Sequence, residues 1–193
     1  KLEGEVFLSK PDLMFYNDGR HPLIYMYEPP IEKEEYEAAV DELAGTPVEA
    51  LMFCLGDGRT VLHDTQVGEL LGHNVEQWDH LVFRRAHQNA KHLIDSGDDP
   101  LRIVCDRAHE LGMQLYPPLI VQRGGVDHAS VRCSDFRRHN QHLEIGAGGD
   151  VDPDFPGFEG LDLKHAAARD ERFAIVAEVV GEYPVDGFEL HLN

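Results

Sequence analysis

The chain has 193 residues, of which 42% are hydrophobic, enough to bury a sizeable core and to exclude a wholly disordered protein. It carries 36 acidic against 17 basic side chains, a formal net charge of −19. So negative a surface repels phosphate backbones and anionic lipids, and nucleic-acid binding is therefore not expected. No apolar run approaches the roughly 18 residues that a membrane-spanning helix needs.

Short apolar runs alternate along the chain with segments whose apolar residues recur at helical spacing. Strands that alternate with helices need crossover connections, so the pattern predicts an α/β fold with a parallel sheet. Asp99 and Pro100 are typical of a helix start, and Gly112 of a helix end. The predicted strands are Leu23–Tyr27, Val48–Leu55, Met113–Val121 and Gly187–Leu192. The predicted helical faces are Tyr36–Leu43, Trp78–Ile94, Leu101–Leu111, and the set Phe173, Val176, Ala177 and Val180.

The connections after the predicted strands are long, at residues 56–76 and 122–164, whereas the returns from helix to strand are short. This asymmetry is typical of a (β/α)8 barrel, in which the long connections build the active-site face. The segment 122–164 is rich in Gly, Asp and Pro, but apolar residues such as Phe136 predict that it is ordered. A self-contained flavodoxin-like sheet is the alternative fold.

Three stretches together resemble the bacterial glycosyl-hydrolase-like family ten barrels. They are residues 101–113 (LRIVCDRAHELGM), residues 134–141 (SDFRRHNQ) and residues 183–190 (YPVDGFEL). The resemblance implies that 1–193 is a single domain, the N-terminal half of a (β/α)8 TIM-barrel-type fold with the first four βα units only. It departs from the family where an aspartate usually follows Glu-Leu, because His191 stands there. Substrates of that family are mostly unassigned.

The fourth predicted strand carries the candidate catalytic residues. Alternation puts Phe188, Leu190 and Leu192 on one face and Glu189, His191 and Asn193 on the other. A polar face inside a barrel suits a glycosidase, which works with a pair of carboxyl groups. Glu189 and His191 are therefore the predicted catalytic residues, and Asn193 a predicted substrate ligand. The alternative is a structural polar layer.

Other candidate substrate ligands follow the first three predicted strands. Tyr27 and Glu28 combine an aromatic ring with a carboxylate, which suits sugar stacking and hydroxyl recognition. Asp57 follows the second strand in a Gly-rich turn, where a turn role comes first and a ligand role second. The segment after the third strand adds the remaining polar candidates, for which loop solvation is the alternative. These are Arg123, Asp127 and His128.

The sequence has twelve histidines, some of which could bind a metal ion. Four of them fall on connections or at a strand end: His63, His73, His128 and His191. They could join Asp57, Asp127 or Glu189 around a divalent ion, but no pair has zinc-type spacing. No metal and no cofactor is therefore predicted, and nucleotide-binding glycine motifs are missing from the sequence as well. Three cysteines give no disulfide framework. Cys54 and Cys105 are expected in the core and Cys133 at the surface.

The sequence thus predicts a glycoside hydrolase that acts on a poly- or oligosaccharide by carboxylate acid–base chemistry. Its second carboxylate is expected in a missing half of the barrel. A metal-dependent sugar isomerase or epimerase and a non-catalytic carbohydrate-binding barrel are the alternatives. The chain starts at Lys1 without a signal peptide or an initiator methionine, so cytoplasm and export after removal of a leader both stay open. The oligomeric state is not predicted.

Overall fold

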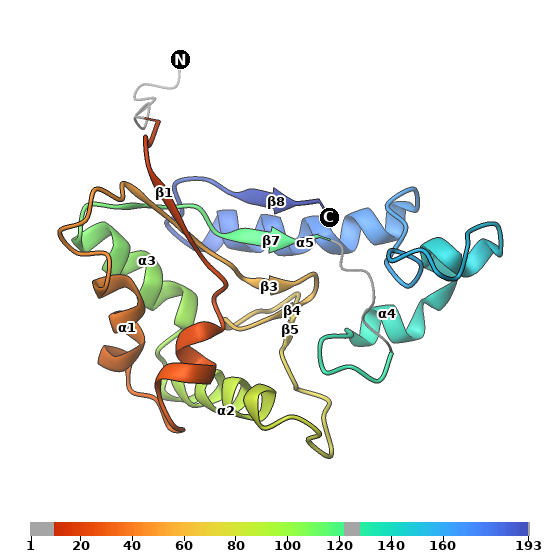
Figure 1. Cartoon of the computed structure of the whole chain (residues 1–193), viewed down its shortest axis with the longest axis horizontal. Helices are drawn as coiled ribbons and strands as arrows, with labels where there is room; N and C mark the ends of the chain where they lie inside the picture. Colours follow the sequence, from red (N-terminus) through yellow and green to blue (C-terminus); the bar gives the residue numbers. More distant parts are fainter. Residues whose placement is uncertain (1–9, 122–127, 193) are drawn as a thin grey trace.

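The structure is a computed structural model that describes residues 10–121 and 128–192 (Figure 1). Helices and strands alternate along the chain and the main strands are parallel, which confirms the predicted mixed α/β fold. The strands are β1 (Met14–Asn17), β2 (Ala50–Phe53), β3 (Gly56–Asp57), β4 (Thr60–Val61), β5 (Glu69–Leu70), β6 (Gln114–Leu115), β7 (Pro118–Ile120) and β8 (Glu189–His191). The helices are α1 (Lys33–Asp41), α2 (Leu81–Ser96), α3 (Pro100–Glu110), α4 (Asp135–His139) and α5 (Ala166–Glu182), with a π-helix η1 (Pro22–Met26) and 3-10 helices η2 (Gln141–Leu143) and η3 (Ile145–Gly148).

The parallel strands lie side by side in chain order. β1 pairs with β2, β2 with β6, β3 with β7, and β7 with β8. Backbone hydrogen bonds continue between the named strands, since Cys54 N donates to Asn17 O and Leu55 N to Pro118 O, both at 2.9 Å. Pro117 and Pro118 lack an N–H, which explains why the ladder is interrupted between β6 and β7. Because β1 pairs with β2 alone in the described sheet, the flavodoxin-like alternative, whose first strand is internal, is wrong.

One face of this sheet packs against helices. Leu51 of β2 and Leu119 of β7 are fully buried in a core that also takes residues from α1, α2, α3 and α5. Tyr36 of α1 meets Phe53 of β2 edge-on, with ring centroids 6.1 Å apart. In Figure 1, α1, α2 and α3 lie together on one side, and α5 runs behind β7 and β8. Side chains that alternate with the buried ones therefore point to the opposite face.

Helix α3 confirms its sequence prediction. The Asp99 carboxylate accepts a hydrogen bond from Leu101 N at 3.0 Å, and Pro100 occupies the first turn, where a missing N–H costs nothing. Gly112 follows the helix with a φ of +76°, a conformation that side-chain-bearing residues rarely adopt. Val104 is fully buried, as the apolar spacing predicts.

The first predicted strand is wrong. Leu23–Tyr27 overlaps η1, whose Leu23 and Ile24 are buried, and the first strand is β1, farther toward the N-terminus. A short apolar run has no clear period, so a buried helical turn and a buried strand give the same signal. Pro22 in the first turn of η1 is consistent with the helical outcome.

Helix α5 forms where predicted, but its buried face is not the predicted one. Phe173 is 68% exposed and Val180 54% exposed, whereas Ile175 and Val179 are fully buried. The buried face also carries two glutamates, whose charge hides it from a search for apolar spacing. Neither α5, the longest helix described, nor any other described helix is long and apolar enough to cross a membrane.

The positions of the three cysteines agree with the sequence prediction for two of them and differ from it for the third. Cys54 and Cys105 are buried and unpaired, as predicted. Cys133 is only 1% exposed, so its predicted surface position is wrong. Its polar sequence neighbours pack inward with it: Ser134 and Arg137 are also buried.

The connections differ in length as the sequence predicts. The chain returns from α3 to β6 and from α5 to β8 within a few residues, whereas Asp57 of β3 is separated from α2, and Ile120 of β7 from α5, by long segments. The α5–β8 return is fixed by Asp186. Its Oδ2 accepts a hydrogen bond from Leu115 N at 2.7 Å and lies 2.8 Å from His109 Nε2. Residues 128–164, with α4, η2 and η3, lie beside the carboxyl ends of β3, β7 and β8 (Figure 1).

Candidate functional site

Glu189 and His191 of β8 lie together on the face of the sheet that is turned away from the helices. In the β7–β8 register, Leu190 pairs with the buried Leu119, so Glu189 and His191 take the opposite face. His191 Nε2 is 2.7 Å from Glu189 Oε1. Glu189 Oε2 is buried and has no hydrogen-bond partner in the described part of the chain. An unpaired carboxylate oxygen is costly unless a ligand or an unseen group completes it.

Tyr16 of β1 reaches the same place from the far edge of the sheet. Its ring stacks on His191, with centroids 5.5 Å apart and an interplanar angle of 22°. Two other strands separate β1 from β8, so in a flat sheet these residues would lie about 14 Å apart. The sheet therefore curves strongly, with Tyr16, His191 and Glu189 on its concave face.

The concave face is partly shielded from water. Burial, followed by the nearby Cys54 thiol, raises the pKa of Tyr16. Burial also raises the pKa of Cys54, whose Sγ lies 3.8 Å from Gly56 O. Both groups are therefore neutral at ordinary pH, and Glu189 is the carboxylate that the described chain brings to the His191–Tyr16 contact.

Asp57, a predicted substrate ligand, binds two arginines. Its Oδ2 lies 3.3 Å from Arg20 Nη1 and 3.4 Å from Arg132 Nε, and its side chain is 6% exposed. Arg20 follows β1 and Arg132 belongs to the connection after β7, so Asp57 ties three connections together at the carboxyl ends of the strands. In this arrangement, Asp57 positions the two guanidinium groups.

Tyr27 and Glu28 lie next to helix α2. The Glu28 side chain is 77% exposed and pairs with Arg85 at 2.6 Å. Tyr27 O accepts a hydrogen bond from Asn89 Nδ2 at 3.3 Å. These residues follow η1 rather than a strand, so their predicted place at a strand tip is wrong.

His128 is held inside the segment 128–164. Its Nε2 is 2.7 Å from Glu144 Oε1, and the same oxygen is 2.7 Å from Arg137 Nε. Glu144 and Arg137 are both buried, so this contact anchors His128 to the interior of the segment. The remaining predicted ligands, Arg123, Asp127 and Asn193, lie outside the described residues.

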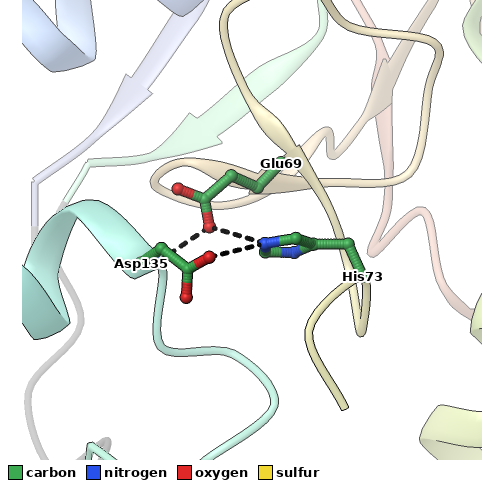
Figure 2. Close-up of side chains that lie close together, drawn as sticks. All are labelled: Glu69, His73 and Asp135. Atoms are coloured by element: carbon green, nitrogen blue, oxygen red, sulfur yellow. Dashed lines mark hydrogen bonds and ion pairs between the residues drawn. The ribbon is translucent and has the colours of Figure 1, made fainter. Parts of the chain in front are cut away.

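A second cluster, which we call the Glu69–His73–Asp135 cluster, joins the two long connections (Figure 2). Glu69 is in β5, His73 follows it, and Asp135 begins α4. His73 Nε2 is 3.0 Å from Asp135 Oδ2 and 3.6 Å from Glu69 Oε2. Hydrogen bonds from His73 and Asn74 hold the pKa of Asp135 below its ordinary value.

An open cavity of about 710 Å³ lies between the same two connections. Asn74 and Arg138, which both contact Asp135, form part of its wall. Trp78 and Phe83 supply aromatic surface, and Arg132 links the cavity to Asp57. Aromatic rings beside polar groups are the combination that small polar ligands such as sugars use.

Sequence reasoning missed Tyr16, Glu69 and Asp135. Tyr16 was hidden because its strand was not predicted, although Met14–Asn17 does contain aromatic residues typical of strands. Glu69 and Asp135 are far apart in the chain, and only the folded connections bring them together. The histidines predicted as possible metal ligands do not meet in one cluster: His63 lies near Glu178 at 3.6 Å, and His128 pairs with Glu144.

No family model matches the chain, and no curated protein sequence matches it. Among solved structures, a noncanonic maltogenic alpha-amylase, AmyB from Thermotoga neapolitana, matches with a TM-score of 0.58 and 16% sequence identity. The match covers 96% of this chain and 40% of that chain. At this identity the match shows a shared fold and no more, and the chain spans less than half of that protein's length. The resemblance to family ten stays a prediction.

Proposed function

We propose that this chain forms the first four βα units of a (β/α)8 barrel that cleaves glycosidic bonds. The observation that supports this proposal most directly is the cluster of Glu189, His191 and Tyr16 on the concave face of the sheet. It places an incompletely paired carboxylate beside an imidazole and an aromatic ring. The fold shared with the maltogenic alpha-amylase also supports the proposal of glycosidic bond cleavage.

The barrel proposal follows from curvature and from uncovered apolar surface. Four parallel strands in chain order with a strongly curved concave face are the geometry of half a closed barrel. On the convex side, Leu190 is 51% exposed and Leu192 72% exposed, and Val180 of α5 is exposed as well. Further strand–helix units would cover these side chains in a complete barrel.

In the proposed mechanism, Glu189 acts on the sugar as a general acid or base, or binds a hydroxyl near the bond that breaks. His191 contacts Glu189 Oε1, and Oε2 has no partner among the described residues, so rotation of the carboxylate would present Oε2 to the substrate. The Tyr16 ring stacks on His191 and fixes the orientation of its imidazole. Glycosidases use two carboxyl groups, about 5–5.5 Å apart for retention or about 6.5–9.5 Å for inversion. The second group would come from a later strand.

The test is the activity of a longer protein that contains this chain, with maltooligosaccharides as the first substrates. Glu189→Gln is expected to lower kcat by about 10²–10⁴-fold, since it removes the proton-transfer group while keeping the shape. Glu182→Gln, on the exposed end of α5, is the matched control and should retain activity. The 193-residue chain alone is expected to be inactive, and turnover by it would contradict the proposal.

A non-catalytic carbohydrate-binding barrel is the second candidate. It is favoured by His191, which stands where the resembling family usually has an aspartate, and by the Trp78 and Phe83 surface in the open cavity. Oligosaccharide binding by the longer protein without any turnover would support it against the glycosidase. For the metal-dependent isomerase no observation on the concave face adds support, because His63, His128 and His191 contact separate carboxylates.

A further inference from the structure

The Glu69–His73–Asp135 cluster aims three ligand atoms at one point. His73 Nε2, Glu69 Oε2 and Asp135 Oδ2 all lie within 4.8 Å of one another, and they come from two connections far apart in the chain (Figure 2). The cluster shares no residue with the Glu189–His191 pair, so binding there can be tested separately from the proposed catalysis.

The other ring nitrogen of His73 defines what Nε2 can do. Nδ1 lies 3.1 Å from Leu70 O, and a carbonyl oxygen can only accept a hydrogen bond. Nδ1 therefore carries a proton. In the imidazolium form Nε2 also carries a proton and donates to Asp135, whereas in the neutral ring Nε2 directs a lone pair at the two carboxylates. Lone pairs that face each other repel unless a cation lies between them. Metal-binding histidines usually donate a hydrogen bond to a carbonyl or carboxylate oxygen from the ring nitrogen that does not bind the metal, as Nδ1 does here.

The far oxygens of both carboxylates are already held by positive or donor groups. Asp135 Oδ1 accepts from Asn74 Nδ2 at 2.6 Å and from Arg138 Nη1 at 3.3 Å. Glu69 Oε1 lies 3.0 Å from Arg59 Nε. Asp135 Oδ2 is directed toward His73, and Glu69 Oε2 faces both His73 and the Asp135 amide, which donates to it at 2.8 Å. The two arginines offset the negative charge of the carboxylates. The arginines weaken the attraction for a cation, but they fix the directions of the oxygens.

We propose that this cluster binds a zinc-type divalent cation through His73 Nε2, Glu69 Oε2 and Asp135 Oδ2. A tetrahedral ion with bonds of about 2.1 Å separates its ligand atoms by about 3.4 Å. The distances of 3.0 and 3.6 Å from Nε2 lie on either side of that value. Imidazole nitrogen favours zinc over calcium or magnesium, which prefer oxygen ligands. His73 and Asp135 side chains are 32% and 39% exposed, which leaves a fourth position for water.

The bound ion joins the connection after β3 to the connection after β7. Asn74 follows His73 directly, and Arg138 lies one turn of α4 beyond Asp135, and both residues form part of the wall of the open cavity. The cation therefore fixes the separation of the two cavity walls. Its role is to hold the ligand-binding surface in shape.

The test is calorimetric titration of the metal-free chain with zinc chloride. We expect one zinc ion bound per chain, and at least about a tenfold loss of affinity in His73→Gln, because a protein ligand is removed. His142→Gln is the matched control, since His142 is exposed and takes no part in the cluster, and it should bind as the unmodified chain does. Magnesium chloride should not compete.

Hydrogen exchange gives a local readout that a loose surface ion would not change. The amides of Asp135 and Phe136 donate to the Glu69 carboxylate at 2.8 and 3.4 Å. Zinc should slow their exchange in the unmodified chain and leave it unchanged in His73→Gln, with far-UV circular dichroism showing that the variant is folded. Equal zinc affinity in both chains, or no zinc binding by the unmodified chain, would overturn the proposal and leave an imidazolium ion pair in its place.

Discussion

Helices α3 and α5 both pack on the same sheet, but they bury different kinds of side chain. The buried face of α3 is apolar, with Leu101 at 4% and Val104 at 0% exposure. The buried face of α5 includes Glu171 and Glu178, while its Phe173 is turned to solvent. For α3, which has an apolar buried face, the sequence predicts both the position of the helix and its buried face. For α5, whose buried face carries glutamates, the sequence predicts the position only.

The difference shows what α5 holds in place. Glu178 accepts hydrogen bonds from Thr65 Oγ1 and Gln66 N, both at 2.6 Å, and from Val67 N at 3.2 Å. It therefore fastens the long connection after β3 to the helix, whereas the buried side chains of α3 make hydrophobic contacts. Loops cannot be buried unless their backbone groups find partners, and Glu178 supplies them.

Removal of the Glu178 carboxylate should have the largest effect on stability. Glu178→Ala leaves the Gln66 and Val67 amides without their acceptor, and we expect a loss of about 3–5 kcal/mol in the free energy of unfolding. Urea denaturation followed by circular dichroism measures it. Glu182→Ala, on the exposed end of the same helix, is the control and should change stability by less than about 0.5 kcal/mol. A loss below about 1 kcal/mol for Glu178→Ala, on the order of a single exposed contact, would contradict the anchoring role of this carboxylate.

Acid should remove the same contribution. Burial alone raises the pKa of Glu178, but the nearby His63 imidazole and the hydrogen bonds from Thr65 and Gln66 outweigh it and hold the pKa at about 2, against an ordinary value of 4.5. A lowered pKa stabilises the fold above the ordinary value, and the stabilisation is lost as pH falls through 4.5 toward 2. The stability advantage of the unmodified chain over Glu178→Gln should shrink by about 3 kcal/mol across that window. A constant difference between the two chains would show that the carboxylate charge is not involved.

The smallest effect is expected on the outward face of α5. Phe173→Ser replaces a side chain that is 68% exposed, and it should change the free energy of unfolding by less than about 0.5 kcal/mol. Leu101→Ser on α3, at 4% exposure, should cost about 2–5 kcal/mol or more. Thermal unfolding of both variants measures the difference between the two faces. In a longer protein whose further units cover α5, Phe173→Ser should become destabilising, which would sharpen the contrast.

Much of the fold was accessible from the sequence, because most of its elements obey simple patterns. The order of strands and helices, the cap at Asp99 and the short returns all follow from local signals. The first strand did not, since the apolar run at Leu23–Tyr27 is a stronger signal than the half-exposed Met14–Asn17. A strand with three of its four side chains about 40% exposed has no alternation to detect.

The candidate site was accessible only where one element carries it. Glu189 and His191 are two residues apart on one strand, so period-2 alternation was sufficient to place them on one face. Tyr16 joins them through curvature of the sheet, and Asp135 joins His73 through two long connections, neither of which local patterns encode. The predicted ligands Glu28, Asp57 and His128 were assigned by position after a strand, and each is held by a different partner.

The tight bonding of Asp186 to Leu115 and His109 has a practical consequence for changing this protein. It secures the amino ends of the strands, opposite to the long connections, so this end of the sheet is held without contacts from residues 128–164. Exchange of residues 128–164 for other sequences should therefore alter what the molecule recognises while the strands keep their register. Directed evolution of new specificities would be best confined to that segment.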